Sequence, residues 1–461
     1  MTNQHALPAT DTAARMPVRP DRRILLRTLI IGSLTGFAAT ACGSDGATVL
    51  KTAGATKGAI SGGSVVKAEV ALAQPPAGSA AKGAEAVRAF TAALTSRLLT
   101  DKTGNLVCSP FSVALALGMT ANGAVGATQQ EMLNTLDFDS VEGLDAGLAA
   151  VVRLAESRAG KRTDAMGTSY EIALDSANSL WPQRGSEFQK PFLDAVAKWF
   201  GAGLHTVDYK ADAEAARTEI NGWTSEQTQA KIPELIPHGV LSPATRLVLV
   251  NAVYFKAPWN VPFTPALTAP GPFTGDKGDA RQVPMMHNGF SAPYAHGSGW
   301  ESVTLHFAGR ELAMTLVRTE DPGVSAQRAW LTADKLRSAL TATDQPAVQL
   351  TLPKWNFRTP SPLTAILPAM GMPLAFDADK ADFSAMTTQE RLYISAVIHE
   401  AFIAVDENGA EAAAATAVIM DAAGAPAEPK ALTFDRPFLF VIHEVESATP
   451  LFIGRVAEPS A

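Results

Sequence analysis

The side chains that could act as nucleophiles, bases or metal ligands do not stand at the spacings that catalysis needs. Eight histidines occur, and His399-Glu400 and His443-Glu444 both lack the second histidine of an H-E-x-x-H zinc site. Ser109 and Ser112 lie outside any G-x-S-x-G turn of the kind that exposes a nucleophilic serine. No Walker or dinucleotide-binding glycine pattern is present. The sequence therefore predicts neither an enzyme nor a bound metal or cofactor.

The overall composition narrows the class of protein further. The 461 residues are 47% hydrophobic and 18% charged, which is enough apolar material for one large core or two domains. A net charge of −7, without basic blocks that carry interleaved aromatic residues, argues against nucleic-acid binding. The two cysteines, Cys42 and Cys108, are too few for a disulfide scaffold or a cysteine zinc site.

The most unusual stretch runs from Glu407 to Thr416 and reads E-N-G-A-E-A-A-A-A-T. An alternating apolar run precedes it, and a polar tip followed by the apolar run Pro437–Ile442 comes after it. Small side chains would let such a segment enter between two strands, because a large or charged side chain on the buried face would have to be desolvated. An alanine-rich helix and a plain linker fit the same composition.

The alternation of a strand divides this stretch into two faces. One face, which could meet a core, carries Ala410, Ala412, Ala414 and Thr416. The other, which can stay in water, carries Glu411, Ala413 and Ala415.

Residues 1–41 have the pattern of an export signal. Arg22-Arg23 resembles a twin-arginine motif. The apolar stretch Thr28–Ala41 is shorter than the roughly 20 residues of a spanning helix and fits the apolar core of a signal peptide. It ends in Ala39-Thr40-Ala41-Cys42, which is similar to a bacterial lipobox, so Cys42 is expected to carry a lipid on the outer face of a membrane. Simple cleavage after Ala41, with an incidental cysteine, is the alternative.

The remaining chain divides into a tether and one folded domain. Residues 42–82 are rich in Gly, Ala, Ser and Thr without a sustained period, which predicts a flexible tether. Residues 83–461 show no second linker, which predicts a single domain.

Two largely apolar runs in this domain contain a residue that would be buried and polar. Leu247–Lys256 is apolar except for Asn251 and the terminal Lys256, and it predicts a central strand buried on both faces. Val397–Val405 alternates and contains His399. A buried asparagine or histidine needs hydrogen-bond partners, so both are expected to hold internal polar contacts. Upstream, Ser109-Pro110 predicts a helix start, with serine as the cap and proline at the first position.

These blocks together resemble the serpin family from about Asn105 to Pro459. Glu407–Thr416 is similar to the hinge of inhibitory serpins, although Ala410 stands where the family usually has Thr or Ser. The resemblance implies an α+β fold with three β-sheets, about nine helices and an exposed reactive-centre loop. It assigns hinge roles to Glu407, Gly409, Ala410, Glu411, Ala412, Ala413, Ala414, Ala415 and Thr416. It assigns roles in the shutter and breach, where the large sheet opens, to Ser109, Ser112, Asn251, Trp259 and His399.

The function that the resemblance implies is irreversible inhibition of a serine protease, or of a related cysteine protease, by a monomer. The protease would cleave the loop, become acylated and be trapped as the loop inserts into the large sheet. Hinge spacing places the reactive bond at Ala423–Gly424, and counting back from Phe434 places it nearer Pro426. The small residues there suggest an elastase- or subtilisin-like target.

Two alternatives stay open. One is a serpin fold without inhibition, which would serve as a binding or chaperone-like module. The other is a surface-tethered adhesion lipoprotein.

Overall fold

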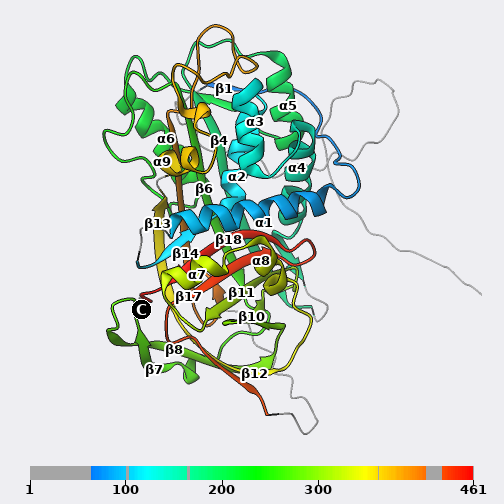
Figure 1. Ribbon diagram of the computed structural model, residues 1–461, viewed down its shortest axis with the longest axis vertical. Coiled ribbons are helices and arrows are strands. Elements are labelled where there is room, and N and C mark those ends of the chain that lie inside the picture. The colour runs from blue at the N-terminus through cyan, green and yellow to red at the C-terminus, as the bar shows by residue number, and fades with distance from the viewer. Residues whose placement is uncertain (1–63, 100–102, 164–166, 362, 412–427, 460–461) are drawn as a thin grey trace, which may run out of the picture. The chain divides into compact units, whose positions relative to one another are not determined.

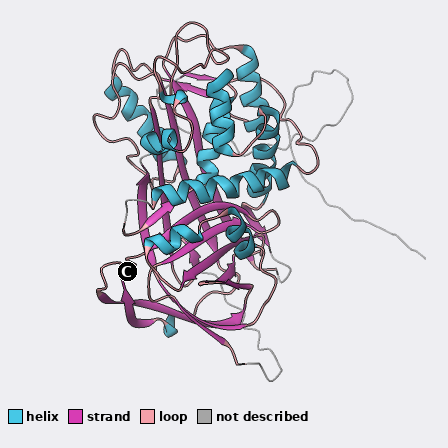
Figure 2. Ribbon diagram, in the orientation of Figure 1, coloured by secondary structure: helices cyan, strands magenta, loops and turns pink. Residues whose placement is uncertain are grey.

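The computed structural model describes residues 64–99, 103–163, 167–361, 363–411 and 428–459 (Figure 1). They all belong to the compact unit Ser61–Ala461. In these ranges three sheets and nine α-helices form an α+β arrangement (Figure 2), which confirms the predicted fold class. No helix in the described ranges has the length and apolar character to cross a membrane.

The eight-stranded sheet, here called the large sheet, contains the two apolar runs singled out above. Its strands lie side by side in the order β1 (Ser64–Val66), β5 (Leu204–Thr206), β4 (Ser169–Pro182), β6 (Leu247–Pro258), β15 (Gly409–Ala410), β14 (Ala396–Val405) and β13 (Trp355–Ser361). The eighth strand, β3 (Gly160–Thr163), pairs with β4 off this path.

Two smaller sheets lie in the lower half of Figure 1. The six-stranded sheet has the order β2 (Leu106–Cys108), β18 (Thr449–Val456), β17 (Phe438–Glu444), β11 (Leu312–Thr319), β10 (Trp300–His306) and β9 (Tyr294–Gly297). The four-stranded sheet has the order β16 (Lys430–Thr433), β12 (Ala347–Pro353), β8 (Ala280–Ser291) and β7 (Ala269–Thr274).

The helices gather mainly around the upper part of the large sheet (Figure 2). Their bounds are α1 (Ser79–Leu98), α2 (Pro110–Ala121), α3 (Gly126–Leu136), α4 (Val141–Ser157), α5 (Lys190–Phe200), α6 (Ala213–Gln227), α7 (Val324–Trp330), α8 (Ala333–Leu340) and α9 (Leu363–Ala369). The long helix α1 runs across the middle of Figure 1, between the helix-rich upper half and the two smaller sheets.

Strand β6 is buried on both faces, as its continuous apolar run predicts. Leu249, Val253 and Phe255 point into the main core, where α2 packs against β4 and β6. Val250 and Ala252 point the other way, into a smaller core that α6 helps to form. The one charged residue of the strand, Lys256, is also its one residue that is not fully buried, because a charge inside a strand that lacks water on both faces would have to be desolvated.

Helix α2 begins where the sequence indicates. Ser109 is its N-cap, the Ser109 hydroxyl accepts a hydrogen bond from the Ser112 amide at 3.3 Å, and Pro110 takes the first helical position. Every residue from Pro110 to Ala121 is buried. The helix therefore fixes two serines directly beneath the large sheet.

The start of the ordered domain differs from the predicted boundary at residue 82. Ser64–Val66 pairs with β5 as an edge strand, and α1 already begins at Ser79. The Ala73 amide also donates to the Lys198 carbonyl at 2.9 Å. Composition misses this attachment because an extended segment can pair with a sheet edge through its backbone, whatever its side chains. The expected export signal, Cys42 and residues 42–63 lie outside the described residues.

Candidate functional site

The candidate site lies where the central strands of the large sheet separate. β6 and β14 pair in parallel from Val248 with Ala396 to Val253 with Ala401. Beyond that point β15 lies between them, antiparallel to both. The sheet is therefore closed at one end and holds the first residues of the hinge at the other.

Two hinge residues occupy strand positions in this gap. Gly409 lies opposite Pro258, and Ala410 lies opposite Ala257 on β6 and Val405 on β14. The Glu411 amide adds a hydrogen bond to the Ala404 carbonyl at 3.0 Å. Other residues of the predicted site, namely Ala412–Thr416 and the reactive bond Ala423–Gly424, lie outside the described residues.

Close packing explains why this segment starts with glycine and alanine. A Cβ atom on Gly409 would lie 2.2 Å from the Ala257 carbonyl oxygen and 2.7 Å from the Pro258 Cα. Both are backbone atoms, which cannot turn aside as a flexible side chain can. The Ala410 side chain is fully buried. Alanine, in place of the family's usual Thr or Ser, fits this apolar position without a hydroxyl to satisfy.

A buried polar network holds β6 and β14 together below the gap. Asn251 and His399 stand opposite each other in the parallel pairing. The His399 ring donates through Nδ1 to the Asn251 side-chain oxygen, and its Nε2 accepts from the Ser109 amide at 3.0 Å. This pair of contacts fixes the neutral imidazole with its proton on Nδ1, because a charged ring could not accept.

The same network reaches the neighbouring strand through Asn178. The Ser112 hydroxyl donates to the Asn178 side-chain oxygen at 2.6 Å, and the Asn251 amide group donates to both. Asn178 stands opposite Asn251 in the β4–β6 pairing. The structure thus brings four predicted shutter residues together, and adds Asn178, whose only sequence signal is a polar side chain in an imperfectly alternating strand.

Burial keeps His399 neutral. It lowers the pKa of His399 to about 4, although the contact with the Asn251 backbone carbonyl acts in the opposite direction. His443 is also buried, His205 and His306 are half-buried, and burial lowers the pKa of each of them to about 4.

We expect the folded protein to lose stability as the pH falls from about 6.5, the ordinary histidine value, to about 4. In that window these histidines are protonated in the unfolded chain but remain neutral in the folded state. Each one therefore lowers the free energy of unfolding by up to about 1.4 kcal/mol for each pH unit of acidification. Asp145, whose pKa burial raises to about 7, contributes with the opposite sign. Urea unfolding at pH 7 and pH 5 would measure the net effect.

The contribution of His399 to this pH dependence of stability can be measured with a variant. His399→Gln removes one titrating group, so its stability should fall less steeply between pH 6.5 and 4 than that of the wild type. Identical slopes in the two proteins would show that His399 does not couple the network to pH.

Trp259, for which the resemblance implies a role in the breach, lies at the entrance of the gap. Its indole N–H donates to the Asp406 carbonyl at 3.0 Å, and its amide donates to the Asn408 carbonyl at 2.8 Å. The ring stacks on Phe307 at a centroid distance of 4.6 Å. Trp259 therefore ties the end of β6 to the two residues on either side of Glu407.

Glu407 is anchored by side chains that no sequence pattern revealed. Its carboxylate accepts from Lys354 Nζ at 2.9 Å and from the Thr268 hydroxyl at 2.8 Å. Burial would raise the pKa of Glu407, but the hydrogen bonds from Lys354 and Thr268 hold it below its usual value. The base of the hinge is thus fixed by an ion pair before the chain enters the gap.

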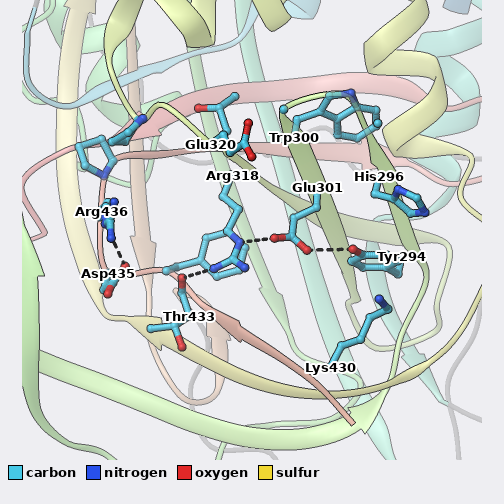
Figure 3. Close-up of a pocket in the computed structure, with 16 residues that line it drawn as sticks. Tyr294, His296, Trp300, Glu301, Arg318, Glu320, Lys430, Thr433, Asp435 and Arg436 are labelled. Atoms are coloured by element: carbon cyan, nitrogen blue, oxygen red, sulfur yellow. Dashed lines mark hydrogen bonds and ion pairs between the residues drawn. The ribbon is translucent and has the colours of Figure 1, made fainter. Parts of the chain in front are cut away.

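The chain beyond the loop is anchored at β16, the edge of the four-stranded sheet. Arg318 donates to the Thr433 carbonyl at 3.0 Å and to the Glu301 carboxylate at 2.6 Å, and Tyr294 donates to the same carboxylate at 2.8 Å. Figure 3 shows these side chains around a cavity of about 520 Å³. Both ends of the loop are therefore held by charge-assisted contacts.

Comparison with known proteins places this geometry in a family. The family model described as Serpin (serine protease inhibitor) matches residues 85–459. The leukocyte elastase inhibitor A of Rattus norvegicus is 35% identical over 366 residues, which cover 77% of this chain and 94% of the relative. An uncharacterized serpin-like protein of Thermococcus kodakarensis is 34% identical over 377 residues, which cover 81% of this chain and 85% of that protein.

Solved structures agree with the sequence comparisons. The native state of the thermophilic serpin Tengpin superposes with a TM-score of 0.73 at 27% identity, covering 85% of this chain and 97% of that chain. Serpin48 of the insect Tenebrio molitor superposes with a TM-score of 0.70 at 29% identity, covering 82% and 98%. No group of histidine, cysteine and acidic side chains in the described part of the chain could hold a metal ion.

Proposed function

The chain belongs to the serpin family of serine protease inhibitors, and on that premise we propose that it inhibits its target irreversibly by inserting its cleaved loop into the large sheet. The observation that carries the proposal is the position of Gly409 and Ala410, which already stand between β6 and β14. A longer inserted strand would continue from them in the same register.

The chemistry is supplied by the protease. Its nucleophilic oxygen attacks the Ala423 carbonyl carbon, the peptide bond to Gly424 breaks, and Gly424 leaves as a free amine that takes up a proton. The loop up to Ala423 is then joined to the protease as an ester. If the loop enters the sheet before water hydrolyses this ester, the protease is carried away with it and trapped.

The driving force must come mainly from the sheet itself. Each new hydrogen bond contributes roughly 1 kcal/mol net, whereas fixing each residue of the loop costs roughly 1–2 kcal/mol. A cavity of about 160 Å³ lies beneath the large sheet between α2, α4 and β4, with Ser109 and Asn178 in its lining. Such a void leaves its lining without packing partners, so filling it on rearrangement would release free energy.

Incubation with a panel of serine proteases tests the proposal. An inhibitor of this kind leaves a complex with its target that survives SDS and boiling. Cleavage of the loop without any such complex would reject the proposed mechanism and favour the non-inhibitory binding or chaperone-like module.

We expect the target to be elastase- or subtilisin-like and to cleave between Ala423 and Gly424. The hinge spacing supports this bond over the alternative nearer Pro426, since the length that inserts is limited by the sheet. That leukocyte elastase inhibitors are among the relatives supports the target class. Mass spectrometry of the released C-terminal peptide would locate the cut. A stable complex formed by cleavage after Lys430 or Arg436 would contradict this assignment.

We further propose that the protein is exported as a monomer and held on the outer face of a bacterial membrane through a lipid on Cys42. The twin arginines and the lipobox-like sequence support this location. Cys42→Ala should then shift the protein from the membrane fraction to the medium. A wild-type protein that is already soluble, with a mature N-terminus elsewhere, would contradict lipidation.

A further inference from the structure

An ion pair meets the hinge where it leaves the large sheet. Glu411 Oε1 pairs with Lys231 Nζ, from the segment that follows α6. The same ammonium lies 5.6 Å from the centre of the Phe402 ring on β14. Lys231 therefore contacts both the hinge and a strand that borders the gap.

Unusual backbone conformations gather at this contact. Six non-glycine residues in the described ranges have positive φ, and three of them are Gln229 (50°), Ala230 (59°) and Glu411 (47°). A left-handed conformation costs roughly 1–2 kcal/mol for such residues. The Gln229 side chain donates to Asp175 on β4 at 2.9 Å, which fixes the turn over the sheet. Strain of this kind persists only where surrounding contacts enforce it.

The Glu411 carboxylate depends on Lys231 for its charge compensation. Its side chain is 18% exposed, and its second oxygen, Oε2, is buried without a hydrogen-bond partner. The Tyr254 hydroxyl also hydrogen-bonds this carboxylate, and the pKa of Tyr254 is raised to about 12, first by burial and then by the charge and the hydrogen bond of Glu411. Without Lys231, this partly desolvated carboxylate would lose its opposite charge and keep only the neutral Tyr254 hydroxyl as a partner, which is costly.

The Lys231–Glu411 ion pair resists withdrawal of the hinge from the sheet but not its further insertion. Ala410 points into the main core. Glu411 pairs with Lys231, next to Ile232 of the smaller core on the other face of the sheet. In an inserted strand residue 411 keeps that face by alternation, so the pair can persist when Glu411 turns to an extended conformation. Withdrawal of the hinge, by contrast, must separate the two charges.

We propose that Lys231 is a positioning residue that opposes withdrawal of the hinge and thereby keeps Gly409 and Ala410 in the sheet, ready for the cleaved loop to follow. The effect of Lys231 on trapping of the protease rests on the proposed inhibitory function, whereas its effect on the position of the hinge in the free protein does not. Two measurements separate them.

The first measurement uses the free protein. Lys231→Met removes the charge and keeps the apolar stem, and should speed hydrogen exchange at the Glu411 amide about fivefold, which corresponds to the roughly 1 kcal/mol of an ion pair near the surface. Glu411→Gln should have the same effect from the other side of the pair. Lys231→Arg, which keeps the positive charge, is the control and should exchange like the wild type. Unchanged exchange in both Lys231→Met and Glu411→Gln would overturn the proposal.

The second measurement uses the target protease. In Lys231→Met the hinge must re-enter the gap after cleavage, so more loop is hydrolysed before trapping and the stoichiometry of inhibition should rise, with recovery in Lys231→Arg. Faster exchange with unchanged stoichiometry would overturn the kinetic part alone. If the wild type forms no complex with any protease, the proposed function fails, while the exchange result still decides the role of Lys231.

Discussion

Replacing Ala412 with arginine should convert the protein from an inhibitor into a substrate of its target protease. Ala410 points into the core, and alternation gives Ala412 the same face, so the guanidinium would have to be desolvated for the strand to grow. A barrier of a few kcal/mol slows insertion at least about tenfold relative to hydrolysis of the acyl-enzyme, because each 1.4 kcal/mol is a factor of ten. The stoichiometry of inhibition should rise accordingly, with loop cleavage unimpaired.

The neighbouring position provides the matched control. Ala413 has the outward parity of Glu411, so Ala413→Arg places the same charge on the opposite face and should inhibit much more nearly like the wild type. Heat resistance of the cleaved form reports insertion independently of the protease. Equal, full inhibition by both variants would mean that the hinge does not insert as a strand, and the trapping mechanism would have to be abandoned.

Replacing Asn251 with alanine should strongly destabilise the closed sheet. The change leaves Ser112, Asn178 and His399 with one hydrogen bond fewer each, in a region where Asn251 itself is fully buried. These groups keep other partners, so each lost hydrogen bond costs about 0.5–1.5 kcal/mol net, and we expect a total loss of about 2–4 kcal/mol. The first unfolding transition in urea should move to lower concentration.

A second consequence concerns the lifetime of the active form. β6 and β14 are held together next to the gap by this network, so Asn251→Ala should also speed the spontaneous loss of inhibitory activity on warming. Lys256→Met, on the same strand but away from the network, serves as the control. Unfolding midpoints and activity half-lives that match those of the control would show that the network does not keep the sheet closed.

The sequence alone predicted much of the local structure around the site. The apolar run Leu247–Lys256 predicted a strand buried on both faces, and Ser109-Pro110 predicted the start of α2. Asn251 and His399 were singled out as buried polar residues that need partners, and the structure pairs them. These predictions succeed because hydrophobic periodicity reports which faces of an element lack water, and because caps and buried polar groups follow local rules.

Other features could be seen only in the folded chain. Lys354 and Thr268 reach Glu407, Asn178 completes the polar network, and Lys231 reaches Glu411, each across more than fifty residues of sequence. None of these side chains stands in a pattern that distinguishes it from an ordinary surface or strand residue. The pairing of β1 with β5 and the left-handed turn at Gln229 are likewise features of the backbone, and no residue pattern in the sequence predicts them.

The division has a physical reason. The small residues of the hinge could be recognised from the sequence, because any residue that enters a sheet must fit between two strands. How far the hinge has entered in the free protein depends on the width of the gap between β6 and β14 and on charges brought to it from distant segments. Those quantities are set when the sheet, α6 and the chain after it pack together, so only the tertiary structure decided that Gly409 and Ala410 are inserted and that the chain turns away at Glu411.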